Sequence, residues 1–136
     1  MHFLEHPELV AQDGYTAFAS GLWFYMTPQS PKPSMHDVVS GFYEPNAADT
    51  AAGIRGGFGS TINIINGGIE CGGGTNSKAE SRGEYYLEFL SEFGIDTANE
   101  EDLGCVTEQS FPTGGTGDAL GFFQAGASGQ CELVTW

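Results

Sequence analysis

The sequence has 136 residues, enough for one domain with one core, and 40% of them are hydrophobic. Its 18 acidic and 4 basic residues give a formal net charge of −14 at pH 7. A chain this acidic repels phosphate backbones and anionic membrane surfaces, which argues against nucleic acid and membranes as partners. A neutral ligand is unaffected by this field. The first residues lack the basic and apolar regions of a signal peptide, and no apolar run reaches the roughly 18 residues of a membrane span.

Residues 13–26 form the first predicted helix. Asp13 is suited to cap its N-terminus, and aromatic and aliphatic residues recur at three- and four-residue steps. They occupy almost the whole circumference, so we expect this helix to be buried on most sides. Pro28 and Pro31 prevent its continuation.

A second, short helix is predicted between Ser34 and Gly41. Ser34 and Asp37 have the spacing of a capping box, and Gly41 ends the helix. Residues 42–59 are rich in glycine and are expected to be mostly loop.

The next stretch is expected to be a short buried helix. Ser60 or Thr61 is suited to cap it, and it is predicted to end at Ile65 because Gly67 and Gly68 disfavour a helix interior by about 1 kcal/mol each.

Two asparagines lie among the isoleucines of this stretch. Asn63 and Asn66 are poor choices for a regular element, because their amides compete with the backbone for hydrogen bonds. Either they cap backbone groups inside the fold, or they face a ligand. The stretch alone leaves both interpretations open.

The clearest helix spans residues 77–93, with Gly94 where a left-handed C-terminal cap belongs. Its acidic face is interpreted as solvated. Arg82 lies close to the apolar stripe, twelve residues after Glu70, and an ion pair between them is expected. A paired carboxylate has a lowered pKa, which favours a structural or electrostatic role for Glu70 over proton donation.

The spacing of the cysteines and glycines does not indicate a cofactor site. Cys71, Cys105 and Cys131 form no Cys-x-x-Cys pair and have no histidine beside them, so a metal site is not expected. One disulfide with a leftover thiol fits better. The glycine-rich segments lack the spacing of a P-loop or dinucleotide fingerprint, and no cofactor is predicted.

Two motifs carry a family resemblance. The segment 23–38, Trp-Phe-Tyr-Met-Thr-Pro-Gln-Ser-Pro-Lys-Pro-Ser-Met-His-Asp-Val, resembles a segment of the family 19 glycoside hydrolases, the chitinases. The segment 63–72, Asn-Ile-Ile-Asn-Gly-Gly-Ile-Glu-Cys-Gly, is similar to the most recognisable motif of that family almost letter for letter. The resemblance runs from about residue 7 to Phe111. We therefore divide the chain into a chitinase-like part, 1–111, and a Gly/Ser/Thr-rich extension, 112–136.

The resemblance implies a mainly α, lysozyme-like fold, of which this chain would be the C-terminal lobe with long Gly/Pro-rich loops. Members of the family cleave β-1,4-linked N-acetylglucosamine polymers with inversion, in a cleft between two lobes. By position, Lys32 and Asn66 correspond to residues lining the sugar subsites, with Gln29 and Ile65 close by.

Further positions correspond to the supporting structure of the family's cleft. Arg82 and Glu70 match its ion-pair network, and Cys71 and Cys105 match a disulfide. Both catalytic glutamates of the family lie upstream of the matched region, in segments that this sequence does not contain.

Three functions remain open at this point. The chain is one lobe of a secreted chitinase, active only with the absent part; or a non-catalytic chitin-binding or extracellular structural protein; or a lobe of a peptidoglycan-directed hydrolase. The expected ligand is chitin or N-acetylglucosamine oligosaccharides. Another chain, or a second copy, is a further expected partner that would cover the surface of the absent lobe.

Overall fold

The computed structural model describes residues 3–98 and 103–119, and within these ranges the fold is mainly α, as predicted. The helices of these ranges are α1 (Leu9–Gln12), α2 (Gly14–Met26), α3 (Met35–Ser40), α4 (Ala47–Ala51), α5 (Gly57–Glu70), α6 (Ser77–Glu92) and α7 (Thr116–Ala119). None of them is long and apolar enough to cross a membrane.

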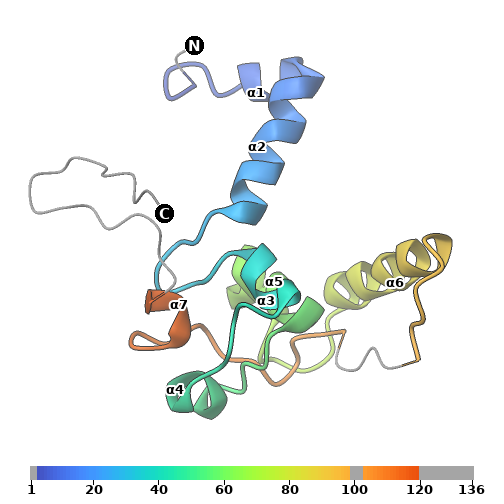
Figure 1. Cartoon of the computed structure of the whole chain (residues 1–136). Helices are drawn as coiled ribbons and strands as arrows, with labels where there is room; N and C mark the ends of the chain where they lie inside the picture. The colour runs from blue at the N-terminus through green and yellow to red at the C-terminus, as the bar shows by residue number, and fades with distance from the viewer. Residues whose placement is uncertain (1–2, 99–102, 120–136) are drawn as a thin grey trace, which may run out of the picture.

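Helices α3 and α5 pack together at the centre of the molecule (Figure 1). Their contact forms the larger of two apolar clusters, whose buried members are Met35, Val38, Tyr43, Ile54, Ile64 and Phe111. A smaller cluster joins α5 to α6 and consists of Ile62, Ala79 and Cys105. The central helix α5 therefore contributes to both clusters and connects the two halves of the core.

The predicted capping box of α3 is confirmed. Ser34 Oγ accepts a hydrogen bond from the Asp37 amide at 3.0 Å, and the Asp37 carboxylate accepts from the Ser34 amide at 3.2 Å. Gly41 ends the helix at φ 82°, in the left-handed region that favours glycine.

Helix α4 lies within the segment 42–59 that was predicted to be mostly loop, and the sequence did not predict this helix. Asn46 caps it by accepting from the amides of Ala48 and Asp49, and Asp49 accepts in return from the Asn46 amide at 3.1 Å. The helix is too short to show an apolar period, and its stability comes from this reciprocal cap.

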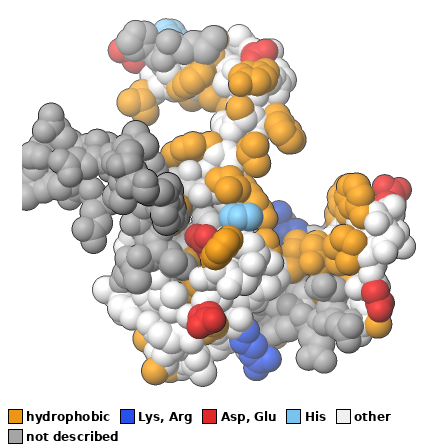
Figure 2. Space-filling view, viewed as in Figure 1, with side chains coloured by type: hydrophobic (Ala, Val, Ile, Leu, Met, Phe, Trp, Pro, Cys, Tyr) orange, Lys and Arg blue, Asp and Glu red, His pale blue; other side chains and the backbone are white. Residues whose placement is uncertain are grey.

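Helix α2 is not buried as predicted: none of its 13 residues is buried. Asp13 does cap it, accepting from the Thr16 amide at 2.8 Å. Phe24 and Tyr25, near its C-terminal end, pack against the central cluster. The rest of α2 extends away from the body toward α1, and hydrophobic side chains are spread over that end of the molecule (Figures 1 and 2).

The predicted start of the central helix was also wrong. Helix α5 begins ahead of Ser60 and Thr61, after Gly56 in a left-handed conformation of φ 84°. Ser60 is buried and bonds elsewhere: its Oγ accepts from the Gly56 amide at 3.1 Å and donates to Glu108. The hydroxyl therefore fixes the entry to the helix without capping its first turn.

The predicted end of this helix at Ile65 was wrong for a different reason. Helix α5 continues through Gly67 to Glu70, with a kink at Asn66, whose φ of −149° and ψ of 30° are not helical. A Cβ at Gly67 would collide with Oδ1 of Asn63 one turn earlier. The glycine is therefore required for close packing inside the helix, and this need outweighs its low helix propensity.

Helix α6 matches its prediction closely. Asn76 caps it, accepting from the amides of Lys78 and Ala79, and Gly94 follows it at φ 70°. Gly83 is buried against Leu103. The C-terminal half of α6 has no buried residue.

The first residues of the predicted extension contact the body of the molecule. Asn46 Nδ2 donates to the Gly114 carbonyl at 3.0 Å, and the Thr116 amide donates to the buried Asp49 at 2.8 Å. The division at residues 111 and 112 stays a prediction, and Cys131 lies outside the described residues.

Candidate functional site

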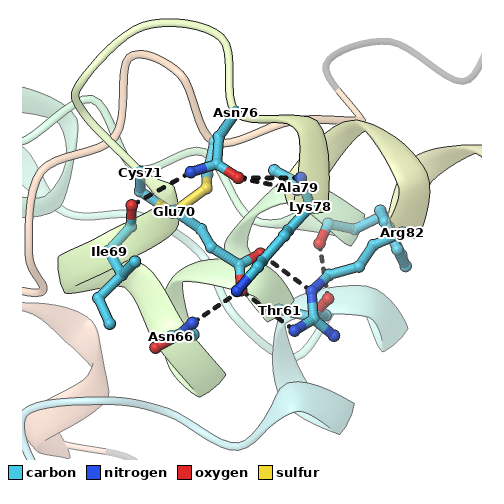
Figure 3. A network of polar contacts seen from close by, with 11 residues as sticks. Thr61, Asn66, Ile69, Glu70, Cys71, Asn76, Lys78, Ala79 and Arg82 are labelled. Carbon is cyan, nitrogen blue, oxygen red and sulfur yellow. Dashed lines mark hydrogen bonds and ion pairs between the residues drawn. A yellow bond between two sulfur atoms is a disulfide. The ribbon is translucent and has the colours of Figure 1, made fainter.

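The centre of the candidate site is the ion pair between Glu70, the last residue of α5, and Arg82 in α6 (Figure 3). Arg82 Nε donates to Glu70 Oε2 at 3.0 Å, and its second nitrogen, Nη2, donates to Oε1 at 3.1 Å. The Glu70 side chain is fully buried, whereas 43% of the Arg82 side chain is exposed. This two-point contact fixes the carboxylate in the geometry that suits a guanidinium fork.

Asn66 completes the coordination of this carboxylate. Its Nδ2 donates to Glu70 Oε1 at 2.8 Å (Figure 3). The two residues are one helical turn apart, and the kink at Asn66 lies within that turn. The amide nitrogen carries two hydrogens, and the bond to Glu70 uses one of them.

The surroundings hold Glu70 in its ionised form. Hydrogen bonds from Arg82 lower the pKa of Glu70, with a smaller contribution from Asn66, and these effects outweigh the burial that would raise it. The nearby positive charge of Lys78 acts in the same direction. The carboxylate in turn raises the pKa of Arg82 above its usual value. Glu70 is therefore an acceptor and an anchor, and is poorly suited to give up a proton near neutral pH.

The backbone around Glu70 is tied to two other segments. Cys71 forms a disulfide with Cys105, as the resemblance implied. Asn76 Nδ2 donates to the Ile69 carbonyl at 3.3 Å while its Oδ1 caps α6. The end of α5 and the start of α6 are thus held together, which positions Glu70 opposite Arg82.

Lys32 reaches the same helix from the segment between α2 and α3. Its ammonium donates to the Ile64 carbonyl at 2.9 Å. The backbones of Gln29 and Lys32 pair in both directions, at 2.9 Å and 2.8 Å, around the cis Ser30–Pro31 peptide. This tight turn directs Lys32 toward α5.

Ile65 lies on the exposed side of α5 at the edge of a small hollow. The hollow has a volume of about 130 Å³ and is lined by Met35, Phe58, Thr61, Ile62, Ile65 and Arg82. Its walls are mostly apolar, with the Arg82 side chain as the charged group. Phe58 also stacks on Tyr86 of α6 at 4.2 Å between ring centroids.

The structure therefore brings three of the predicted residues together and connects two others to the same helix. Asn66, Glu70 and Arg82 are in direct contact. Lys32 contacts the backbone of α5 at the Ile64 carbonyl, and the backbone of Gln29 pairs with that of Lys32. Whether these side chains bind sugar stays a prediction.

Asn63 has a structural role, which is the first of the two interpretations that the sequence left open. It is buried, and its Nδ2 donates to Glu108 Oε2 at 3.0 Å and to the Gln109 carbonyl at 2.8 Å. The buried Glu108 was not predicted from the sequence. An isolated acid in an irregular segment gives no periodic signal, and only the search for a partner of Asn63 points toward it.

One further residue of the site, Lys78, lies in the helix face that was interpreted as solvated. Its positive charge lowers the pKa of Glu70. Within the described residues, no group of three or more His, Cys, Asp or Glu side chains is arranged to hold a metal ion. The site therefore combines the amide of Asn66 and the guanidinium of Arg82 on Glu70, the ammonium of Lys32 on the Ile64 carbonyl, and an apolar hollow that Arg82 also lines.

Comparison with known proteins matches this arrangement to a family. The model of the glycoside hydrolase family 19, described as Chitinase class I, matches residues 1–105. The chain belongs to this family. The resemblance in the motifs 23–38 and 63–72 is thereby confirmed, and the mainly α architecture agrees with it.

Curated relatives agree with the family model. Endochitinase B of Nicotiana tabacum is 48% identical over 111 residues, which are 82% of this chain and 34% of the relative. Endochitinase 1 of Theobroma cacao is 44% identical over 117 residues, 86% of this chain and 36% of the relative. Endochitinase of Carica papaya is 43% identical over 111 residues, 82% of this chain and 45% of the relative. The family 19 chain thus spans between a third and a half of the length of these relatives.

Proposed function

We propose that this chain supplies one wall of the substrate cleft of a chitinase-type glycoside hydrolase, which cleaves β-1,4-linked N-acetylglucosamine polymers with inversion. The observation that supports it is the network of Asn66 and Glu70 on α5 with Arg82 on α6, together with the contact of Lys32 with α5. Ammonium and amide donors suit sugar hydroxyls and acetamide oxygens, and the net charge of −14 does not oppose a neutral polymer.

In this proposal the acid and the base come from polypeptide outside the present sequence. Inverting hydrolysis needs two carboxyl groups about 6.5–9.5 Å apart, one of them protonated when the substrate binds. Glu70 is unsuited to the acid role, because Arg82 and Asn66 lower its pKa. Glu70 and Arg82 therefore act as positioning residues, and Lys32 and Asn66, with Gln29 and Ile65 beside them, contact the sugar.

The same observation favours a second candidate, a non-catalytic chitin-binding protein. A site whose carboxylate is held ionised binds a neutral sugar without cleaving it. The two proposals differ in turnover, because the first gives hydrolysis of N-acetylglucosamine oligomers when the upstream part of a relative is supplied and the second gives binding alone.

The disulfide between Cys71 and Cys105 supports secretion, since such bonds persist in oxidising compartments.

The test is titration of the chain with N-acetylglucosamine oligosaccharides by calorimetry. Lys32→Ala and Asn66→Ala should each raise Kd about tenfold, the effect of losing one hydrogen bond to a ligand. Lys32→Met, which keeps most of the stem but not the ammonium, should resemble Lys32→Ala.

Gln12→Ala is the matched control, because it removes an exposed amide at the end of α1, in a different helix from the candidate site. Its Kd should equal that of the unaltered chain. Unchanged binding in both site variants, with helical circular dichroism retained, would remove the site assignment. Tighter binding of peptidoglycan fragments than of chitin oligomers would move the proposal to the peptidoglycan-directed class.

A further inference from the structure

Residues 112–117 lie between helix α4 and the segment that joins α2 to α3 (Figure 1). On the α4 side, the Thr116 amide donates to the fully buried Asp49 at 2.8 Å. The Asn46 side chain donates to the Gly114 carbonyl at 3.0 Å. The start of the Gly/Ser/Thr-rich part of the chain is therefore attached to α4 through both side chains of the reciprocal cap.

Two glycines of this segment are buried against their neighbours. A Cβ at Gly115 would collide with the carboxylate of Asp49. A Cβ at Gly117 would collide with the carbonyl of Pro31 and the ring of Pro33. The φ angle of neither glycine lies in the left-handed region, so the backbone conformation would accept a side chain and only the lack of space excludes one.

The two prolines in contact with Gly117 are the chain neighbours of Lys32 on either side. Pro33 is fully buried, so the contact with Gly117 helps to fix the backbone that carries the lysine. A lysine stem has much rotamer freedom, and the direction of its ammonium depends on where its backbone is held. The Lys32 ammonium donates to the Ile64 carbonyl at 2.9 Å, and its other hydrogens are left for a ligand.

We infer that Gly117 is a positioning residue for Lys32, because its close contact with the two prolines holds the lysine where its ammonium reaches α5. The family model matches residues 1–105 and so does not cover Gly117. The inference rests on the proposed function only for the sugar that Lys32 contacts. The position of the ammonium is measured without sugar, so a failure of positioning and a failure of sugar binding are separate outcomes.

The first test is the chemical reactivity of the lysines in the full chain. There are two, and Lys78 is the internal reference for Lys32. The chain is treated briefly with an amine-acylating reagent, and mass spectrometry of its peptides gives the ratio of acylation at Lys32 to that at Lys78. Gly117→Ala should raise this ratio at least about threefold, the effect of weakening the one hydrogen bond that holds the ammonium in its charged form.

Gly21→Ala is the matched control, because Gly21 lies inside α2 and an added Cβ there meets no atom within 4 Å. Its acylation ratio should change by less than about twofold, as for an ordinary exposed substitution. Thr116→Val is a second, milder variant, which loses the hydroxyl bond to the Glu44 carbonyl at 2.7 Å. It should raise the ratio by a smaller factor than Gly117→Ala does, and it decides the result if Gly117→Ala loses its helical circular dichroism.

Calorimetry with N-acetylglucosamine oligosaccharides tests the connection to the ligand. Gly117→Ala should raise Kd at least about threefold, because the ammonium is no longer held in place. Combined with Lys32→Ala it should have no further effect, since there is then no ammonium to position. An unaltered chain that binds no sugar would contradict the proposed function, and the acylation ratio would still decide whether Gly117 positions Lys32.

Three results would overturn the inference. The first is an unchanged ratio in Gly117→Ala with circular dichroism retained, or in Thr116→Val where Gly117→Ala unfolds. The second is an equal rise in Gly117→Ala and Gly21→Ala, which would indicate a general loosening of the chain. The third, in a chain that binds sugar, is that the effects of Gly117→Ala and Lys32→Ala on the free energy of binding add, which would mean that Gly117 acts on binding without Lys32.

Discussion

Arg82 holds both carboxylate oxygens of Glu70 although the two side chains differ widely in exposure. The carboxylate is fully buried, and 43% of the arginine side chain is in contact with solvent. The carboxylate depends on this partner far more than the guanidinium does, because water can replace Glu70 around Arg82 but not Arg82 around Glu70.

Removal of the guanidinium should therefore destabilise the fold. Arg82→Ala leaves Glu70 buried with Asn66 as its described hydrogen-bond donor, and we expect a loss of about 1–3 kcal/mol in the free energy of unfolding, reduced from a fully buried pair by the exposure of Arg82. Arg82→Lys should lose less, because it keeps the charge without the fork. Urea denaturation measures both.

The comparison variant is Lys78→Ala, which removes an exposed cation one turn earlier in α6 that acts on Glu70 through its charge, whereas Arg82 also donates hydrogen bonds to it. Its free energy of unfolding should change by no more than about 0.5 kcal/mol. Equal losses in the two variants would indicate a general effect of charge instead of the contact with Glu70.

Acid should weaken the fold through the same carboxylate. The pKa of Glu70 is lowered from 4.5 on folding, so its contribution is present above the unfolded pKa and is lost as the pH falls through the folded pKa. The stability advantage of the unaltered chain over Glu70→Gln should therefore be constant near neutral pH and shrink below about pH 4.5. Thermal unfolding at successive pH values tests this, and a gap that does not depend on pH would contradict it.

Gly67 and Gly68 should respond in opposite directions to alanine. Gly67→Ala forces a methyl group against the buried Asn63, which bonds Glu108 and Gln109, and should cost about 2–4 kcal/mol. At Gly68 an added Cβ meets no atom within 4 Å, and alanine should stabilise the helix by up to about 1 kcal/mol. A loss at both positions would mean that backbone strain, and not the contact with Asn63, sets the effect.

Reduction of the disulfide between Cys71 and Cys105 should loosen the join between α5 and α6. The two cysteines are 34 residues apart, and closing a loop of this length stabilises by about 3–4 kcal/mol. Thermal unfolding with and without a thiol reductant measures the effect. Cys131→Ser should leave it unchanged, and Cys71→Ser combined with Cys105→Ser should abolish it.

The sequence predicted those elements whose signals are local. Helix α6 has a regular apolar period, a capping asparagine at Asn76 and a terminating Gly94. The capping box of Ser34 and Asp37 likewise needs only its own residues. The pairing of Cys71 with Cys105 came from the family resemblance, since three cysteines alone leave the pairing open.

The errors arose where packing with distant segments decides the structure. The sequence predicts that the helix ends before Gly67, but the absence of a side chain at Gly67 leaves room for Asn63. The position of Asn63 depends in turn on its hydrogen bond to Glu108, which is far along the chain. The contact of Lys32 with the Ile64 carbonyl joins residues that are 32 positions apart, and no local pattern predicts it. The apolar circumference of α2 predicts a buried helix, but the described part of the chain does not bury it.

The interruption of α5 at Asn66 has a consequence for how the molecule opens. The last turn of the helix is connected to the rest of α5 through a residue that is not helical, while Arg82, Cys105 and Asn76 hold it from outside. Amide protons in that turn should exchange with solvent in step with the start of α6 and separately from the first turns of α5. The Glu70 carboxylate thus lies between two units that are expected to open separately, and its position depends on both of them.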